Sequence, residues 1–328
     1  MRTIGKAISL SLFVCMLFSM FSITASAITF YVEDFGFVID SSTSQATVVE
    51  YTGNDTDLRI PSKVYDYKVT ALDDSLFAGN KNIKSVSIPS SVTAIGKNAF
   101  QGCTSIEKIT IPKTVTSVGR NIFQNCTALE EVEFFADINI LPQSTFYNCT
   151  SLKTVRFSDN ITQIGNSAFY NCEALEYVPS IENLTSIGQN AFYNTAIKEM
   201  VATQNITSIE RYSFANCENL VKVYLPKNIM TIDKTAFSGS DSVKLYCYPD
   251  TYALTYAVDN AFNYGVLIKG NVNVDHNIDI KDVTEIQKYL AGLDLPDEFS
   301  LDYSDVNEDG SITIADATDL QKQLADLI

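Results

Sequence analysis

The sequence predicts a strand-rich repeat solenoid followed by a small all-α domain. Phenylalanine recurs at steps of 23 residues, with one step of 22, over 160 residues of the chain. A unit of this size cannot bury its own apolar face, so the strict period indicates that neighbouring units stack and cover one another. Near residue 270 the pattern changes to two acidic loops, each followed by an amphipathic helix. The eight repeating anchors are Phe77, Phe100, Phe123, Phe146, Phe169, Phe192, Phe214 and Phe237.

Each repeat contains two short segments with strand character. The first alternates apolar and polar residues, as at Val132 and Phe134, which is typical of a strand with one buried face. The second has two apolar residues three apart, such as Ile161 and Ile164. The single short step is a deletion near Thr195, in a turn where the stack can absorb it. Glycine follows the second segment in four repeats, where we expect a turn with positive φ, at Gly96, Gly119, Gly165 and Gly188.

The repeats resemble a known family. The phrases SVSIPSSVTAIGKNAFQGCTSI and KITIPKTVTSVGRNIFQNCTAL are similar to the leucine-rich repeats of BspA-like proteins, and the resemblance covers residues 58–240 in eight units. Residues 28–67 resemble the strand-rich N-terminal cap of that family, and residues 241–269 its C-terminal cap with a short linker. Caps are needed because an open end would expose apolar surface and unpaired strand edges.

Two acidic loops in the tail have the spacing of a cation site. Both place oxygen-bearing side chains at positions 1, 3, 5, 9 and 12, the pattern that surrounds Ca²⁺ in an EF-hand loop. We call residues 271–282 loop 1 and residues 305–316 loop 2. The expected ligands of loop 1 are Asn271, Asn273, Asp275, Asn277 (by its carbonyl), Asp279 and Asp282. Those of loop 2 are Asp305, Asn307, Asp309, Ser311 (by its carbonyl), Thr313 (through water) and Asp316.

The sequence predicts two bound Ca²⁺ ions, with the weaker one at loop 1. Loop 1 begins with neutral Asn271, and its sixth position is His276, where loop 2 has Gly310 for the sharp turn. Fewer charges and a strained turn should both lower the calcium affinity of loop 1. The alternative is a pair of acidic turns that bind nothing, since such patterns also arise by chance.

The loops and their helices resemble type I dockerins. Each loop is followed by one amphipathic helix, VTEIQKYLAGL or ATDLQKQLADL, without a matching helix before it, and Asp stands at position 12. The match covers residues 270–328. It implies calcium-dependent docking onto a cohesin module of a scaffoldin, in the cellulosome of an anaerobic, fibre-degrading bacterium. In that family positions 10 and 11 help to choose the cohesin, and here they differ between the loops: Ile280 and Lys281, against Ile314 and Ala315.

The N-terminus predicts secretion. Arg2 and Lys6 precede an apolar run that ends near Ile23, and Ala25-Ser26-Ala27 is a suitable cleavage site, so residues 1–27 are an expected signal peptide. No other segment is apolar and long enough to span a bilayer. We expect an extracellular protein that is held at a cell surface or in a cellulosome only through a partner.

Charge restricts the partners. The chain has 23 basic and 39 acidic residues, a net charge of −16, and residues 270–328 alone hold 14 acidic and three basic side chains, a net charge of −11. Nucleic acid and anionic membrane are therefore poor partners, and we expect neither nucleic-acid binding nor membrane insertion. Without calcium, the tail should repel itself and loosen.

Five of the seven cysteines share one position in the repeat, three residues after the anchor. A recurring residue forms a column inside the stack, and Thr195 and Ser240 at the same position imply a small, buried side chain. We favour reduced, buried thiols, although adjacent turns about 5 Å apart would also allow a disulfide. The column consists of Cys103, Cys126, Cys149, Cys172 and Cys217.

The sequence predicts a protein that is not an enzyme. The single histidine, His276, lies inside loop 1, which excludes a histidine-based triad. Acidic pairs such as Glu131 and Glu133 exist, but a glycosidase needs two carboxylates that face each other across a cleft. A polysaccharide-active enzyme of unfamiliar type is the less favoured alternative.

The outer surface of the repeats carries the candidates for ligand binding. Tyrosine follows the anchor in three consecutive repeats and should form a ladder roughly 10 Å long. Such rings suit a sugar face or a protein partner, or they pack on one another to shield the turn. We expect the array to recognise a protein or a glycan, with a carbohydrate-binding module of a polysaccharide-degrading complex as the alternative. The candidate residues are Tyr147, Tyr170, Tyr193, Phe135, Arg156 and Tyr177.

Overall fold

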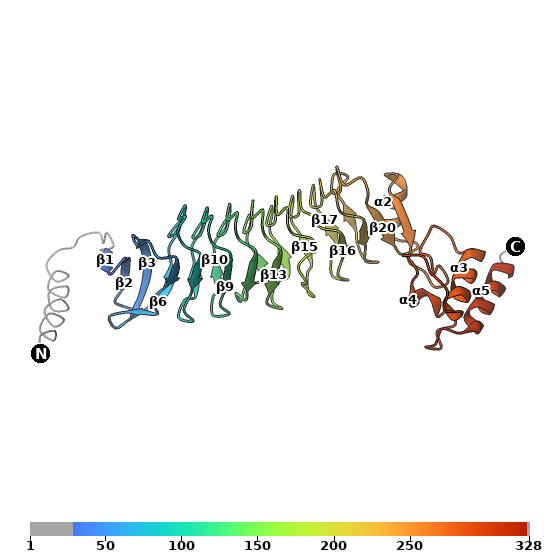
Figure 1. Cartoon of the computed structure of the whole chain (residues 1–328), viewed down its shortest axis with the longest axis horizontal. Helices are drawn as coiled ribbons and strands as arrows, with labels where there is room; N and C mark the ends of the chain where they lie inside the picture. The colour runs from blue at the N-terminus through green and yellow to red at the C-terminus, as the bar shows by residue number, and fades with distance from the viewer. Residues whose placement is uncertain (1–28, 327–328) are drawn as a thin grey trace, which may run out of the picture.

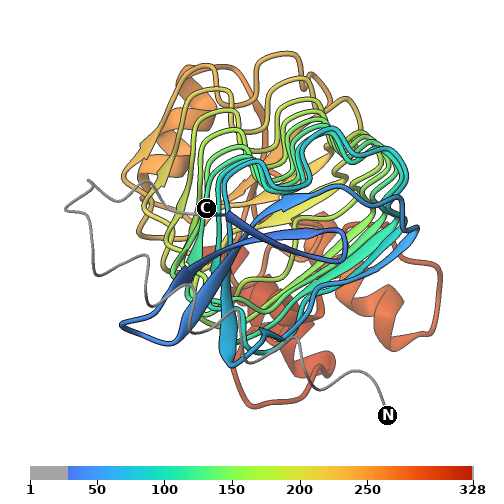
Figure 2. The ribbon, with the colours of Figure 1, turned by 90° about the vertical axis from the view of Figure 1, so that its left-hand side faces the viewer.

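The protein is an elongated solenoid with a helical domain at its C-terminal end (Figure 1). The computed structural model describes residues 29–326, and the expected signal peptide lies outside the described residues. The solenoid is strand-rich and has about ten turns. Seen from the N-terminal end, successive turns overlie one another (Figure 2). The predicted fold class, a repeat solenoid followed by a small helical domain, is confirmed.

Short antiparallel strands close the N-terminal end. They bury Phe37 and Val48 against the first turn and cover a strand edge that would otherwise be open. β1, β2 and β3 form an antiparallel meander, and β3 then pairs in parallel with β6. This part of the chain contains β1 (Thr29–Val32), β2 (Phe35–Asp40), β3 (Gln45–Tyr51), β5 (Lys63–Val64), which pairs antiparallel with β6 (Tyr67–Leu72), and β4 (Asp57–Arg59), which pairs only in parallel, with β7 (Ser85–Ser87).

Two rows of parallel strands run along the array. The first row contains β4, β7 (Ser85–Ser87), β9 (Lys108–Ile111), β11 (Glu131–Phe134), β13 (Thr154–Phe157), β16 (Glu199–Val201), β18 (Lys222–Tyr224), β20 (Lys244–Cys247) and β21 (Asn263–Val266). The second row contains β6, β8 (Ala94–Ile95), β10 (Ser117–Val118), β12 (Ile140–Leu141), β14 (Gln163–Ile164), β15 (Ser186–Ile187), β17 (Ser208–Ile209) and β19 (Thr231–Ile232).

Both rows are interrupted, the second between β10 and β12 and the first between β13 and β16. In the turn between β13 and β16, a single isolated bridge joins Tyr177 to Glu199. Pro179 occupies a strand position there and has no N–H to give to a ladder, and Ser180 replaces the usual apolar residue. The first row is therefore split into two sheets, which changes the outer surface near Tyr177.

The anchor phenylalanines form one continuous stack in the core. All eight are buried, with neighbouring ring centroids 5.1 to 5.9 Å apart and interplanar angles of 3° to 24°. The shorter step between Phe192 and Phe214 leaves the stack intact, with centroids 5.2 Å apart. Stacked aromatic pairs contribute about 0.5–1.5 kcal/mol each beyond area burial, so the column reinforces the register of the turns.

The glycines after the second strand are required for a reason other than the predicted one. Positive φ occurs two residues later, at Asn121 (60°) and Ser144 (54°), and not at Gly119 itself. A Cβ on Gly119 would lie 2.4 Å from the backbone nitrogen of Lys97 in the preceding turn. The expected positive-φ turn is therefore wrong, and close approach of adjacent turns excludes a side chain. The same correction applies to Gly96, Gly165 and Gly188.

The cysteine column is buried and reduced, as predicted. All six cysteines that the structure describes are free and buried. Each thiol of the column donates to the carbonyl oxygen of the anchor phenylalanine one turn earlier, as from Cys149 Sγ to Phe123 O at 3.1 Å. Ser240 Oγ makes the equivalent bond to Phe214 O at 2.7 Å. Burial raises the pKa of the Cys103 thiol to about 12, so these thiols are protonated.

Helices follow the last turns of the array. α2 (Tyr252–Asp259), capped by Thr251, lies over the C-terminal end, and β21 completes the first row. The terminal domain contains α3 (Ile280–Leu290), α4 (Leu301–Ser304) and α5 (Ile314–Asp326) around a core that includes Val283 and Leu320. The one-turn helix α4, which precedes loop 2, was not expected. None of the helices that the structure describes is long and apolar enough to cross a membrane.

Candidate calcium and docking site

Loop 2 is held by hydrogen bonds from its own backbone to its predicted ligands. The N–H of Asp309 donates to Asp305 Oδ1 (3.1 Å) and Asn307 Oδ1 (3.0 Å), and the N–H of Ser311 donates to Asp309 Oδ1 (2.9 Å). Asp316, at position 12, accepts from the N–H groups of positions 2, 3 and 9 at 2.8 to 3.2 Å. These bonds fix the side-chain oxygens of positions 1, 3, 5 and 12.

Loop 1 repeats this wiring with different residues. The N–H of Asp275 donates to Asn271 Oδ1 (3.2 Å) and Asn273 Oδ1 (3.1 Å), and Asp275 Oδ1 accepts from the N–H of Asn277 (2.8 Å). Asp282 again accepts from positions 2, 3 and 9, at 2.8 to 3.2 Å. Asp279 at position 9 also caps α3 through the N–H of Lys281 (2.6 Å). The register of the two loops predicted this equivalence.

The sixth position separates the two loops. In loop 2, Gly310 has φ +87°, and its N–H donates to Asp305 Oδ2 at 3.0 Å. His276 in loop 1 does not have positive φ, so the strain expected at this histidine is absent. Its ring stacks instead on Tyr264 of β21, with centroids 4.0 Å apart. Loop 1 therefore has the same main hydrogen-bond pattern as loop 2, although the backbone conformation of its sixth residue differs.

The two position-12 carboxylates have different electrostatics. Both are inaccessible to solvent. Burial raises the pKa of Asp282 and outweighs the three backbone N–H donors that lower it. Burial also raises the pKa of Asp316, but there the backbone donors and the Thr313 hydroxyl prevail, so that its pKa lies below the usual value. Ionisation of Asp282 therefore depends more on a nearby positive charge than ionisation of Asp316 does.

The chemistry of both loops fits Ca²⁺. Within residues 29–326, no three His, Cys, Asp or Glu side chains gather closely enough to hold a metal by themselves. The loops, however, combine carboxylates with Asn amide oxygens and backbone carbonyls, so carboxylates are only part of each ligand set. All these donors are oxygens, which is the ligand type of a hard cation such as Ca²⁺. A bound cation would supply positive charge among the loop carboxylates.

The tyrosine ladder packs face to face. Tyr147 and Tyr170 have ring centroids 4.7 Å apart, and Tyr170 and Tyr193 4.6 Å apart, with interplanar angles of 7° and 2°. All three rings are half-buried, and burial followed by the neighbouring hydroxyls raises the pKa of Tyr170. The ring faces cover one another as the shielding alternative describes, so the ladder offers ring edges and hydroxyls rather than flat platforms.

An asparagine ladder beside the tyrosines was missed by sequence reasoning. Asn148 Nδ2 donates to Asn125 Oδ1 at 3.0 Å, and the same bond recurs from Asn171 (2.9 Å) and from Asn194 (3.0 Å). These residues also take positive φ, at 54° to 62°. Recurrence of Asn or Gly two residues after the anchor was the available signal, because both tolerate that conformation.

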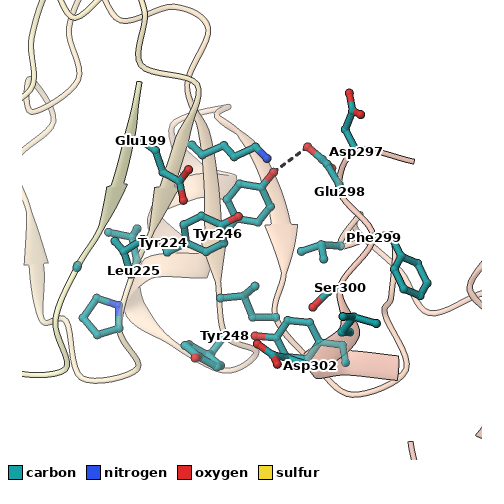
Figure 3. Close-up of a pocket in the computed structure, with 18 of the residues that line it drawn as sticks. Glu199, Tyr224, Leu225, Tyr246, Tyr248, Asp297, Glu298, Phe299, Ser300 and Asp302 are labelled. Carbon is teal, nitrogen blue, oxygen red and sulfur yellow. Dashed lines mark hydrogen bonds between the residues drawn. The ribbon is translucent and has the colours of Figure 1, made fainter. Parts of the chain in front are cut away.

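A cleft lies between the array and the terminal domain (Figure 3). Its volume is about 600 Å³. The array side includes Glu199 and Tyr224, which stacks on Tyr246 at 4.4 Å, and the opposite wall is residues 297–303. Glu298 Oε1 accepts a hydrogen bond from the Tyr246 hydroxyl at 2.7 Å and closes one end. This mixed aromatic and acidic lining was not predicted, because it is formed by residues from two domains.

Comparisons with known families agree with this geometry. The family described as BspA type leucine rich repeat region matches six copies over residues 70–196 and 185–289, and the dockerin type I domain matches residues 269–325. The chain belongs to the BspA-type leucine-rich repeat family. Its C-terminal domain is a type I dockerin. Both are non-catalytic interaction modules, and type I dockerins bind calcium and dock onto cohesins. No curated protein matches this chain.

Solved leucine-rich repeat proteins resemble the array. One from Bacteroides ovatus ATCC 8483 is 21% identical with a TM-score of 0.50, covering 66% of this chain and 70% of that one. One from Eubacterium ventriosum ATCC 27560 is 28% identical with a TM-score of 0.42, covering 62% and 49%. The T. pallidum protein TpLRR is 20% identical with a TM-score of 0.45, covering 72% and 98%. The first of these likenesses supports the fold alone.

The dockerin exposes the residues predicted to meet a cohesin. Ile280 and Ile314, at position 10 of the loops, begin α3 and α5 and are 62% and 63% exposed. Lys281 and Ala315 beside them are also exposed. Ile280 and Ile314 are thus two large, exposed apolar side chains at equivalent positions of the two loop–helix units. The two helix starts remain unequal, because Lys281 is charged and Ala315 is not.

The remaining candidates on the BspA-type array are scattered. Tyr177 is 63% exposed beside the interrupted strand row, and Phe135 is half-buried. Arg156 is exposed, with one guanidinium nitrogen 3.7 Å from Glu133. The structure does not bring these three together with the tyrosine ladder into one closed site. They lie on or beside successive strands of the first row.

Proposed function

We propose that this chain is a secreted, non-catalytic interaction subunit of a cellulosome-type assembly. Its dockerin docks in a calcium-dependent manner onto a cohesin of a scaffoldin, while the BspA-type array presents a recognition surface to a protein or glycan. The matching wiring of loops 1 and 2 supports this function most strongly. It places Ile280 and Ile314 at the same position of the two loop–helix units, at the first residues of α3 and α5.

Each loop binds one Ca²⁺ ion in this proposal. The cation balances the acidic tail, where 14 acidic side chains face three basic ones, and holds α3 and α5 in place. Intrinsic affinity is lower at loop 1, because Asn271 is neutral where loop 2 has Asp305. The ions act on folding and docking rather than on any reaction.

Cohesin docking is tested by calorimetric titration of residues 28–328 against a panel of type I cohesins, with calcium and with chelator. Tight binding should disappear with chelator and in the double variant Asp305→Ala plus Asp316→Ala. Ile314→Asp and Ile280→Asp, made separately, report which helix start the cohesin contacts, with exposed Val221→Asp on the array as a control. Binding that survives chelation and both calcium-loop substitutions would refute the docking role.

Recognition by the tyrosine ladder is a separate part of the proposal. The tyrosine hydroxyls and ring edges, together with the side-chain amides of the neighbouring asparagines, suit hydrogen bonding to a polar ligand. Replacing Tyr147, Tyr170 and Tyr193 together by Ser should abolish ligand binding by the repeats, measured on printed glycan and protein microarrays. Unchanged capture by the triple variant would remove the ladder from the binding surface.

Carbohydrate binding is the second candidate for the array, and the cleft favours it. Glu199 and the half-buried Tyr224 line the cleft together and combine a hydrogen-bond acceptor with an aromatic ring, a combination that suits neutral sugars. Glu199→Gln and Tyr224→Ala should each weaken retention on plant polysaccharide in affinity electrophoresis. Retention that equals wild type in both variants would leave a protein as the partner class.

A further inference from the structure

We infer that the last turn of the array is part of the first calcium site: β21 holds loop 1 in its calcium-binding shape. The N–H of Val266 donates to Asp275 O at 2.9 Å, directly from the end of β21 into the loop. Asn271 Nδ2 in turn donates hydrogen bonds to Val266 O (2.8 Å) and Asp275 O (2.9 Å). Loop 1 therefore continues the hydrogen-bonding edge of the solenoid.

Side chains on β21 fit closely against the loop. Tyr264 stacks on His276, the residue that replaces glycine at position 6, with an interplanar angle of 16°. Gly265 lets the backbone approach, since a Cβ there would lie 2.4 Å from Val274 O. The histidine therefore has a partner in the array, and the glycine is needed for contact between the two domains.

The residue at position 4 of loop 1 packs against the array, whereas the residue at position 4 of loop 2 is exposed to solvent. Val274 has φ 47°, a left-handed conformation that is strained for a β-branched residue. It is 4% exposed and packs in a cluster with Tyr246 and Leu267 of the array end. The equivalent residue of loop 2, Glu308, has φ 58° but is exposed. Burial against the array offsets the strain in loop 1.

A second contact fixes the segment between the loops. Glu298 accepts hydrogen bonds from Lys244 Nζ and from the Tyr246 hydroxyl, both on β20. The side chains of Lys244 and Glu298 are 14% and 33% exposed, so this ion pair is partly shielded from water. Loop 2 is joined to the segment that follows β21 by a hydrogen bond from Lys269 Nζ to Asp305 O, at 3.1 Å. The domains therefore meet through loop 1, Glu298 and Tyr303 of α4, which packs against the same array-end cluster as Val274.

Preorganisation by the array compensates for the weaker ligand set of loop 1. Because coupling between two events is reciprocal, calcium at loop 1 should in turn protect β21 from opening. This inference rests on calcium binding by the loops, as in the proposed function, but not on any cohesin.

The test is hydrogen exchange of the full mature chain, followed by mass spectrometry across a calcium titration. Peptides that span loop 1 and loop 2 report the two sites separately. Gly265→Ala should raise the calcium midpoint of loop 1 by about tenfold and leave that of loop 2 within about twofold. Tyr264→Ala, which introduces no clash, should shift loop 1 in the same direction by a smaller factor. Calcium should also slow exchange in β20 and β21 of the wild-type chain.

Tyr177→Ala, which removes an exposed ring elsewhere on the array, is the matched control and should change neither midpoint. Unchanged exchange in β2 and β3 confirms that each variant is folded. Equal shifts at both loops, or no shift at loop 1 while both loops respond to calcium, would overturn the inference and leave the dockerin assignment standing. Failure of both loops to respond to calcium would overturn the calcium sites as well.

Discussion

Single residues in this protein are constrained mainly by the turn before them. Cys149 illustrates the rule, because its thiol is buried and bonds to the Phe123 carbonyl one turn earlier. Repetition in the sequence predicted the column and its small, buried character. The bond itself was not predicted, because a period shows which positions recur but not what their neighbours require. Ser240 shows that a hydroxyl satisfies the same carbonyl.

The column leads to a prediction for Cys149. Cys149→Ser should cost less than about 1 kcal/mol, because the hydroxyl can still donate to Phe123 O. Cys149→Ala should cost about 2 kcal/mol, since it removes the donor and leaves a small cavity. Urea unfolding of the two variants measures the difference. Equal losses would mean that the hydrogen bond contributes nothing to the column.

Glu298 gives a pH dependence to the contact between domains. Burial alone would raise its pKa, but hydrogen bonds from Lys244 and Tyr246 outweigh it and hold the pKa below the usual 4.5. A lowered folded-state pKa stabilises the protein above about pH 4.5, and that stabilisation is lost as the pH falls through the lowered value. Thermal melts should therefore separate wild type from Glu298→Gln at pH 6 and bring them together near pH 3. A constant difference at both pH values would contradict this role.

At the scale of elements, the spacing between adjacent turns is the main constraint. Gly119→Ala should cost about 2–3 kcal/mol, because the new Cβ would meet the Lys97 backbone at 2.4 Å. Gly102→Asn should stay within about 0.5 kcal/mol, since Gly102 has φ 69° and Asn125 occupies the equivalent place at φ 62°. Urea unfolding tests the pair. A tolerated Gly119→Ala would show that the turns can separate.

Sequence periodicity predicted the strands, the anchors and the paired loop–helix units, because each depends on local pattern. It assigned Gly119 the wrong role, since the excluded space belongs to Lys97 of another turn. The packing of Val274 and the stacking of His276 on Tyr264 could not be read from spacing either. Both arise where two domains meet, and neither domain's repeat pattern describes the junction.

At the scale of the whole molecule, charge and calcium divide the chain into two parts. Chelation should unfold the dockerin first, because it leaves the acidic tail without a counter-charge while the Phe stack of the array persists. At a calcium concentration of 100 times Kd, each site adds about 2.7 kcal/mol of stability. Calorimetric scans should show an early transition that calcium moves upward and a later one that it moves little. A single transition, insensitive to chelator, would contradict this division.

The elongated shape suits a two-ended adaptor. The dockerin lies at one end of the array, and the outer strand surface remains open along its length (Figure 1). A scaffold partner at Ile280 or Ile314 and an array ligand near Tyr170 would thus bind far apart along the chain. Under the proposed function, the contact through loop 1 and Glu298 would restrict the angle between the array and a cohesin on the dockerin.

Native mass spectrometry of the mature chain with a matching type I cohesin tests calcium-dependent docking most directly. With calcium, the spectrum should show a one-to-one complex whose dockerin chain carries two calcium ions. With chelator, the same mixture should give the two separate, calcium-free proteins. A complex that persists after chelation, or a chain that takes up no calcium under any condition, would contradict the proposed function.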